Sequence, residues 1–331
     1  MQISDVLSDK KVLFITTKNT DYLRNTQEVE LISKCADSVK VLGYGDKSYI
    51  KRLIKIYFKL FTMSLKAYDT VFVGFSPQLI IPVFGFRFRK KTVISDFFIS
   101  VYDTMVNDRK KFKPKSLMGR FSKSVDKKCI RCSDYTVVDT IADRDYFAEE
   151  FGLVPEKTEV LYLQADNAIY YPREAKKPDK LKDKFTVLYF GSILPLQGVE
   201  VITDAMDILK DRKDMQFIII GPIGKNIRHL ESDNIKYINW LPQEKLAKYI
   251  SYADLCLAGH FNGDIDKAKR TIAGKTYIYE NMGKPMILGE NNANHELFKE
   301  DDRHFFVEMG DGRKLADKIT EIKEKFERKT K

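Results

Sequence analysis

The chain has 331 residues, of which 44% are hydrophobic and 12% aromatic, and its formal net charge is +10. A chain of this length and composition can bury two ordinary hydrophobic cores, so we expect two domains. Its apolar runs are far shorter than the ~20 residues of a membrane-spanning helix, and its first residues show no basic segment followed by an apolar one. These features exclude a transmembrane protein and predict a cytoplasmic one without a secretory signal.

The first half of the chain alternates between strand and helix patterns. Strands are expected at residues 11–16, 38–42, 70–73, 92–94, 135–138 and 159–163, and helices at residues 27–35, 47–66, 121–131 and 141–150. Strands that alternate with helices are typical of βαβ units, in which neighbouring strands run in the same direction. The pattern therefore predicts an α/β fold with a parallel, doubly wound sheet.

The helix expected at residues 47–66 is basic and amphipathic. Apolar residues recur at helical spacing on one side and lysines line another: Ile50, Leu53, Ile54, Tyr57 and Phe61 against Lys51, Lys55 and Lys59. Residues 1–130 hold 25 of the 57 Lys and Arg but only 12 of the 47 Asp and Glu, so the basic character belongs to this half. The helix can face an anionic membrane with its lysines, or pack on the sheet with a solvated lysine face. Nucleic acid is not expected as a partner, because no nucleic-acid-binding motif is present.

Acidic residues follow two strands of this half. Asp96 and Asp103 come after the fourth strand, where they could orient an acceptor hydroxyl or receive its proton, so both are candidate catalytic residues. Helix capping, or ion pairs with Arg109 or Lys110, would be their alternative role. The Asp139-Thr140 pair follows the next strand, where capping of the helix that comes after it is at least as favoured as ligand contact.

A second strand and helix series follows a charged, proline-containing stretch at residues 173–184, which has the composition of a linker. We therefore predict domains at residues 1–171 and 172–331. In the second domain, strands are expected at residues 187–190 and 286–288, and helices at residues 199–209 and 313–331.

Two stretches of the second domain predict a site for a nucleotide-sugar diphosphate. Lys275 opens a short helical pattern that contains Glu280 and ends near Gly283. The start of such a helix attracts an anion, and a carboxylate on the helix can accept hydrogen bonds from both ribose hydroxyls. The strand at residues 187–190 leads through a tight turn between Gly191 and Gly198, where backbone can approach a phosphate closely.

These motifs, in this order, resemble the donor-binding half of family 4 glycosyltransferases of the GT-B type. The matching stretches are Gly191-x6-Gly198, Phe217-Ile-Ile-Ile-Gly-Pro222, Trp240-Leu-Pro242 and Lys267-Ala-x-Arg270-x4-Lys275-x4-Glu280-x2-Gly283-Lys-Pro285. The set is specific, although each motif alone is common. The resemblance covers roughly residues 185–310 well and the N-terminal half loosely.

The resemblance implies the GT-B architecture, in which an N-terminal acceptor-binding domain and a C-terminal donor-binding domain, both Rossmann-like, face a cleft. It allows the last helix to cross back to the first domain, and it implies a retaining, metal-independent mechanism in which the leaving phosphate takes the acceptor proton. The donor-binding residues it implies are Gly191, Ser192, Gln197, Gly221, Leu241, Lys267, Arg270, Lys275 and Glu280.

The sequence departs from this family at three positions of the donor site. Ser192 and Gln197 stand where many members carry basic residues, and Ile272 stands where many carry a glutamate. If a diphosphate binds, its charge must be matched from elsewhere, and a charge-assisted bond to phosphate is roughly twice as strong as a neutral one. We expect Lys267, Arg270 and Lys275 to supply the missing positive charge.

Neither a metal nor another cofactor is expected. The only close cysteine pair, Cys129 and Cys132, has no second cysteine or histidine pair at zinc-ligand spacing. Asp264 and Asp266 match a metal-binding Asp-x-Asp motif in letters only, and we interpret them as part of a solvated loop. No nucleophile triad or glycosidase-type carboxylate pair is evident.

The sequence thus predicts a glycosyltransferase that moves a sugar from a nucleotide-diphosphate donor to a hydroxyl acceptor. UDP is the favoured nucleotide, and the acceptor is expected to be a lipid-linked or polysaccharide intermediate at the inner membrane face. Two alternatives stay open. One is a non-catalytic GT-B subunit that supports a partner enzyme, and the other is a nucleotide-sugar epimerase on the same scaffold.

Overall fold

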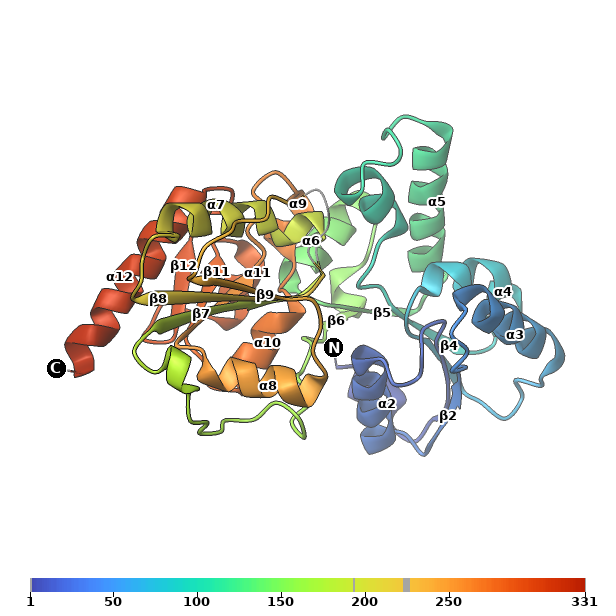
Figure 1. The fold of residues 1–331 in the computed structure, drawn as a ribbon. Helices are drawn as coiled ribbons and strands as arrows, with labels where there is room; N and C mark the ends of the chain where they lie inside the picture. The colour runs from blue at the N-terminus through green and yellow to red at the C-terminus, as the bar shows by residue number, and fades with distance from the viewer. Residues whose placement is uncertain (1, 193, 223–226, 331) are drawn as a thin grey trace. The chain divides into compact units, whose positions relative to one another are not determined.

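The computed structural model describes residues 2–192, 194–222 and 227–330, and it divides into two compact units, Met1–Gln164 and Ala165–Lys331. Each unit is a parallel sheet with helices on both faces (Figure 1). The predicted α/β fold with two doubly wound parallel sheets is confirmed.

The N-terminal unit has six parallel strands in the order β2-β1-β3-β4-β5-β6. The strands are β1 (Lys11–Ile15), β2 (Ser38–Leu42), β3 (Thr70–Val73), β4 (Thr92–Asp96), β5 (Tyr135–Val138) and β6 (Thr158–Val160). The helices are α1 (Ile3–Leu7), α2 (Leu23–Cys35), α3 (Tyr49–Thr62), α4 (Ile81–Phe88), α5 (Leu117–Arg131) and α6 (Ile141–Phe151), and a π-helical turn, η2 (Asp103–Asp108), follows β4.

The C-terminal unit repeats this plan in the order β12-β11-β10-β7-β8-β9. Its strands are β7 (Phe185–Phe190), β8 (Met215–Ile220), β9 (Ile235–Ile238), β10 (Leu255–Gly259), β11 (Met286–Gly289) and β12 (His304–Val307). Its helices are α7 (Val199–Leu209), α8 (Gln243–Tyr252), α9 (Asp266–Arg270), α10 (Gly274–Asn281), α11 (Asn292–Leu297) and α12 (Gly312–Thr330), with a 3-10 turn, η5 (Pro195–Gln197), before α7.

Strands that are buried on both faces explain why the sequence shows continuous apolar runs rather than alternation. In β8, Phe217 and Ile219 lie in the core that α7 and α12 cover, whereas Ile218 and Ile220 lie in the core beneath α8 and α10. Successive side chains of one strand point to opposite faces of its sheet. Each strand of the C-terminal sheet therefore supplies two separate cores.

The compact units divide at residue 164, seven residues before the predicted boundary at residue 171. Tyr170 is buried in the core beneath α8 and α10, and the Asn281 side chain of α10 donates a hydrogen bond to its carbonyl. Lys177, in the predicted linker, forms an ion pair with Asp254. The segment from residue 165 onward thus belongs to the C-terminal unit because it packs there, and composition alone does not reveal that packing.

The last helix, α12, packs on its own unit instead of crossing back. Leu315, Ala316, Ile319 and Ile322 are buried in the core that α12 shares with α7, and Lys323 pairs with Asp214 at 2.8 Å. Lys331, the last residue of the predicted helix, lies outside the described residues. Within the part of the chain that the structure describes, no helix is long and apolar enough to cross a membrane.

Candidate donor site at the carboxyl edge of the C-terminal sheet

The strand order of the C-terminal sheet reverses between β7 and β10. In open α/β sheets ligands bind outside the carboxyl ends of the strands at such a point. Gly191 follows β7 and Gly221 follows β8, with φ angles of 148° and 138°. A Cβ at residue 221 would lie 2.0 Å from the carbonyl oxygen of Gly191, so only glycine permits this close crossing of two loops.

A tight turn brings Gln197 to the same edge. Gly198 follows η5, has a φ of 64° and precedes the first residue of α7. A Cβ on Gly198 would lie 2.5 Å from the backbone nitrogen of Asn262, so the turn is pressed against the loop that follows β10. A Cβ on Gly259, at the end of β10, would lie 3.4 Å from Oε1 of Gln197. The Gln197 amide therefore lies between the carboxyl ends of β7 and β10.

Lys275 places a buried ammonium group at the centre of this edge. Its side chain is 6% exposed, donates a hydrogen bond to Oε1 of Gln197 and lies 4.8 Å from the centre of the Tyr189 ring. Burial lowers the pKa of Lys275 to about 7. Among the described residues no carboxylate lies within ion-pairing distance of Lys275, so an anion bound here would supply its missing counter-charge.

Two further observations support an anion site beside Lys275. The Tyr189 hydroxyl is buried without a hydrogen-bond partner among the described residues, and it lies 3.4 Å from where a Cβ on Gly191 would be. His260 is also buried, and its pKa is lowered to about 3 by burial and then by the charges of Lys275 and Lys267. The local potential is therefore positive, and an unused polar group lies next to it.

The structure brings together most of the donor residues that the sequence predicted. Gly191, Gln197 and Lys275 are in direct proximity, and Gly221 crosses Gly191. Ser192 is exposed immediately after Gly191. The other three predicted residues lie on neighbouring elements: Lys267 and Arg270 on α9, and Leu241 beside the apolar ends of β8 and β9.

Glu280 is not part of this group, which corrects the sequence prediction. It accepts hydrogen bonds from Nε2 of His304 at 2.7 Å and from Arg303 at 3.2 Å, and both partners lie at the amino end of β12. A helix rises about 1.5 Å per residue, so five residues along α10 carry Glu280 roughly 7.5 Å away from Lys275. Residues three or four positions on, Ile278 and Tyr279, share the face of Lys275, and neither is acidic.

We therefore expect Glu280→Gln to leave nucleotide binding unchanged. The substitution removes a partly exposed ion pair with Arg303, which contributes little to stability, and touches nothing near Lys275. Calorimetric titration with UDP should give an affinity within about twofold of wild type, well below the effect of losing a charged hydrogen bond. A loss of tenfold or more would place Glu280 at the nucleotide.

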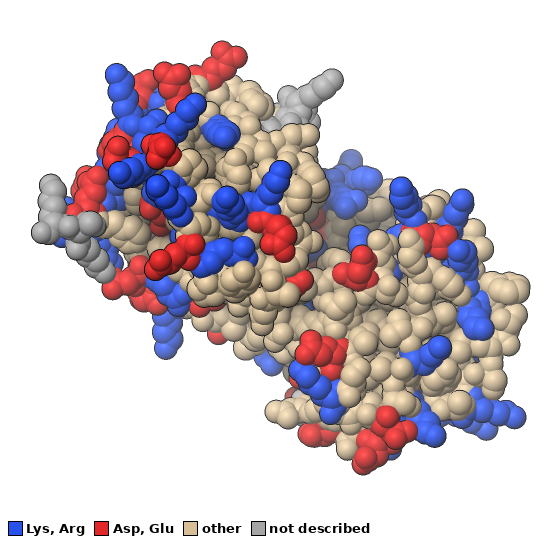
Figure 2. Space-filling view, turned by 60° about the horizontal axis from the view of Figure 1, so that its bottom comes forward, with Lys and Arg blue, Asp and Glu red and all other residues tan. Residues whose placement is uncertain are grey.

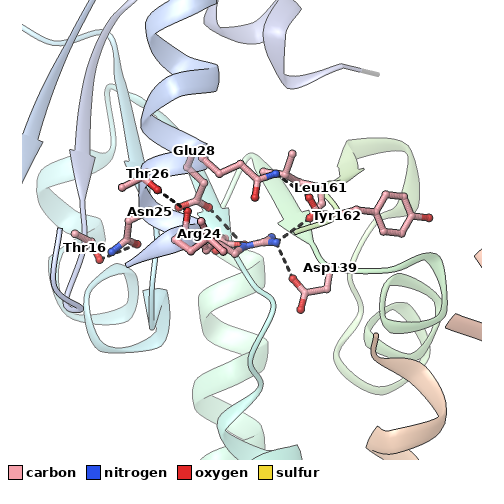
Figure 3. Close-up of polar contacts among 11 residues, drawn as sticks. Thr16, Arg24, Asn25, Thr26, Glu28, Asp139, Leu161 and Tyr162 are labelled. Carbon is pink, nitrogen blue, oxygen red and sulfur yellow. Dashed lines mark hydrogen bonds and ion pairs between the residues drawn. The ribbon is translucent and has the colours of Figure 1, made fainter. Parts of the chain in front are cut away.

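The N-terminal sheet carries a buried charge cluster at its own carboxyl edge (Figure 3). Arg24, on α2, is 2% exposed and pairs with both carboxylate oxygens of Asp96, at 2.9 and 2.7 Å. Its other terminal nitrogen contacts Asp139 at 2.8 Å and donates to the Leu161 carbonyl. Glu28, one turn along α2, is fully buried, and burial followed by the charge of Asp96 raises its pKa well above the usual range.

The cluster corrects the roles predicted for Asp96 and Asp103. Asp96 is fully buried and held by Arg24, and Asp103 is 1% exposed and accepts a hydrogen bond from Asn107. Neither carboxylate is exposed to an acceptor, and the partner of Asp96 is neither Arg109 nor Lys110. Asp139 is the member of the cluster with appreciable exposure, at 29%.

The sequence interpretation missed Arg24, Glu28, His260 and Tyr189. Arg24 and Glu28 are spaced by one helical turn just after the first strand, and this spacing is the signal that could have identified them. The neighbouring Thr140 follows the capping alternative, because its side chain accepts a hydrogen bond from the backbone of Asp143 at 3.0 Å. No group of three His, Cys, Asp or Glu side chains in the described ranges is arranged to hold a metal ion.

Comparison with known proteins places this geometry in a family context. Residues 184–325 match the family model described as Glycosyl transferases group 1. A comparison with curated proteins finds no match. The matched segment contains all six strands of the C-terminal sheet and its helices as far as residue 325 of α12, and it includes Gly191, Gln197 and Lys275.

Solved structures match almost the full chain. Sucrose-phosphate synthase from Thermosynechococcus elongatus has a TM-score of 0.65 and 13% identity, with 95% of this chain and 89% of that chain covered. HepE from Anabaena in complex with UDP-glucose has a TM-score of 0.63 and 13% identity, covering 96% and 91%. A glycosyltransferase from Rickettsia africae has a TM-score of 0.63 and 13% identity, covering 95% and 88%. The chain therefore has the fold of GT-B glycosyltransferases, and its C-terminal unit carries the sequence pattern of the group 1 glycosyl transferases.

Proposed function

We propose that this protein transfers a sugar from a nucleotide-diphosphate donor to a hydroxyl acceptor, with retention and without a metal. The observation that carries the proposal is Lys275, a buried ammonium group without a carboxylate partner among the described residues. It lies beside Gly191, where the strand order of the C-terminal sheet reverses. The structure of HepE with UDP-glucose, on the same fold, supports UDP as the nucleotide.

The chemistry needed at this site is chiefly electrostatic. Departure of the nucleoside diphosphate leaves negative charge on its phosphate, and a fixed cation in a site shielded from water stabilises that charge strongly. Lys275 supplies this cation next to Gly191, where the absence of a side chain lets a phosphate approach the backbone closely. Lys267 and Arg270 add charge on the adjacent helix. The departing phosphate takes the proton of the acceptor hydroxyl, so no basic side chain is required for that step.

The acceptor is proposed to be a lipid-linked or polysaccharide intermediate. On the N-terminal unit, Asp139 replaces Asp96 and Asp103 as the candidate for acceptor contact. It lies just after β5, at the carboxyl edge of its sheet, and is partly exposed while Arg24 fixes its orientation at 2.8 Å. A carboxylate in this place can accept a hydrogen bond from a sugar hydroxyl and position it.

Nucleotide binding is the direct test of this proposal. A ligand that binds only the folded state stabilises it by about 2.7 kcal/mol at a hundred times its dissociation constant, and so raises the melting temperature. At equal concentrations UDP, as the proposed nucleotide, should raise the melting temperature more than GDP, dTDP or ADP. The Lys275→Met variant serves as the matched control and should show little rise. If no nucleoside diphosphate raises the melting temperature, the donor site does not exist in this protein.

One observation favours a second candidate, a non-catalytic GT-B subunit. Ile272 stands where many family members carry a glutamate, and it is partly buried against the apolar core beneath α8 and α10. Both candidates predict nucleotide binding, so turnover separates them. Slow release of UDP from UDP-glucose that stops in Lys275→Met would support the enzyme, whereas binding without any turnover, with acceptor sugars present, would support the subunit.

A further inference from the structure

Helix α3 packs on the N-terminal sheet by one side only. Ile56 and Leu60 are fully buried in the core, and Leu53 and Tyr57 pack against it. The Tyr57 hydroxyl donates to the Leu79 carbonyl, and its ring meets Phe84 edge to face at 5.0 Å. These contacts hold α3 in place on the sheet, so the fold determines which of its other side chains face the solvent.

A second apolar stripe of α3 remains in water. Ile50, Ile54, Phe58 and Phe61 are 68%, 62%, 70% and 60% exposed. With 3.6 residues per turn, these four positions fall within an arc of about 80°. The sequence had grouped Leu53 and Tyr57 with Ile50, Ile54 and Phe61 on one apolar side, but the structure separates them into a buried side and an exposed side. A contiguous row of large exposed apolar side chains marks an interaction surface.

Lysines border this stripe directly. Lys51, Lys55 and Lys59 occupy the neighbouring arc of the helix, between the exposed apolar row and the buried side, and all three are exposed. Lys55 pairs with Asp46 at 2.8 Å. Along the right-hand edge of the face drawn in Figure 2, which belongs to the N-terminal unit, blue Lys and Arg side chains stand among tan surface.

We propose that α3 inserts the stripe Ile50, Ile54, Phe58 and Phe61 into an anionic lipid surface while its lysines contact the head groups. The combination of an apolar row with a basic row is complementary to such a surface. A second copy of the chain is a poorer occupant, because symmetric pairing of α3 would bring like charges together. At 14 residues α3 can lie in the interface but not span a bilayer. The inference rests on the proposed function, since it brings the enzyme to a lipid-linked acceptor.

Vesicle sedimentation tests both halves of the surface. Vesicles of phosphatidylcholine and phosphatidylglycerol in equal parts should bind the wild type at low salt, and pure phosphatidylcholine vesicles should bind it far less. Replacing Lys51, Lys55 and Lys59 by Gln should reduce binding roughly a hundredfold, because each lysine contributes about 1 kcal/mol near an anionic surface. Ile54→Ser with Phe58→Ser should reduce it by a similar factor through lost apolar burial, including at salt concentrations that screen the lysines.

A matched control variant loses the same number of lysine charges from a surface outside α3. Lys180, Lys245 and Lys248 are exposed on the C-terminal unit, and replacing them by Gln should leave vesicle binding unchanged. Each variant should keep the wild-type melting temperature and its response to UDP, so that a failure of lipid binding is distinguished from a failure of the donor site. Absence of wild-type binding at low salt, or an Ile54→Ser, Phe58→Ser variant that binds like wild type, would overturn the inference.

Insertion itself has an optical signature. The chain has one tryptophan, Trp240, so a Phe58→Trp, Trp240→Phe variant carries a single reporter on the stripe. Its emission should shift to shorter wavelength on binding anionic vesicles and be quenched by lipids with brominated chains. Unchanged emission from the bound protein would mean that the lysines hold α3 at the surface without insertion.

Discussion

The Lys275→Met variant is expected to bind a nucleoside diphosphate roughly 10- to 150-fold more weakly than wild type, the equivalent of losing a charged hydrogen bond worth about 1.5–3 kcal/mol. Methionine keeps much of the side-chain volume and the contact with Tyr189 while removing the ammonium group. Affinity for the uncharged nucleoside should change far less. Calorimetric titration with UDP and with uridine measures both, and equal losses for the two ligands would show that Lys275 does not touch phosphate.

The same residue should make donor binding depend on pH. Because burial lowers the pKa of Lys275 to about 7, about half of the free protein carries a neutral amine at neutral pH. A bound diphosphate favours the charged form and raises that pKa, so binding above pH 7 takes up a proton and affinity falls as pH rises. Titrations of UDP-glucose at pH 8 in buffers of different ionisation enthalpy should show this uptake in wild type and not in Lys275→Met.

Stability provides a check in the absence of ligand. The folded pKa of about 7 lies below the ordinary lysine value of 10.5, so between these values the unfolded chain binds more protons and wild-type stability rises with pH. Lys275→Met removes this dependence. The variant should therefore be more stable than wild type at pH 7, and its advantage should shrink by up to about 1.4 kcal/mol per pH unit toward pH 10.

Arg24→Ala should destabilise the N-terminal unit by about 3–5 kcal/mol, because it strands buried carboxylates without their cation. Asp96 would lose both of its short contacts with Arg24, and Glu28 would lose the nearest positive charge.

Hydrogen exchange can localise this effect to one unit of the chain. Peptides from α2 and β4 should exchange faster in Arg24→Ala, while peptides from α7 and β8 should keep their wild-type protection. Asp139→Asn is the matched control, since it breaks a contact with the same arginine at a partly exposed site and should cost under about 1 kcal/mol. An Arg24→Ala variant as stable as wild type would mean that the buried carboxyl groups of the cluster are uncharged in the folded protein.

Local sequence patterns predicted the fold well, because the positions of strands and helices depend largely on residues that are close together in the sequence. The bounds expected for β2, β3 and β5 agree with the structure. Gly283 lies just after the end of α10 and has a φ of 65°, as expected for a glycine that ends a helix. The proximity of Lys275 to Gly191 also follows from their positions, since the start of a helix and the end of a strand meet at one edge of a parallel sheet.

Roles that depend on distant partners could not be predicted in this way. Asp96 pairs with Arg24, 72 positions earlier, and Glu280 pairs with His304, 24 positions later. Asp96 follows a strand and Glu280 lies on a helix, and both positions are compatible with ligand binding. The role of each carboxylate is nevertheless determined by the side chain that packs beside it in the folded protein. The same limit applied to α3, where a helical apolar pattern did not reveal which stripe the sheet would bury.

The burial of Tyr170 has a practical consequence for dissecting the molecule. A fragment that begins at residue 172 would leave an aromatic-sized hole beneath α8 and α10 and would strip Asn281 of the carbonyl to which it donates. A fragment that begins at residue 165 keeps both contacts and the whole of the matched family segment. Recombinant work on the donor site in isolation, including assignment of its nuclear magnetic resonance spectrum, should therefore start the polypeptide at Ala165.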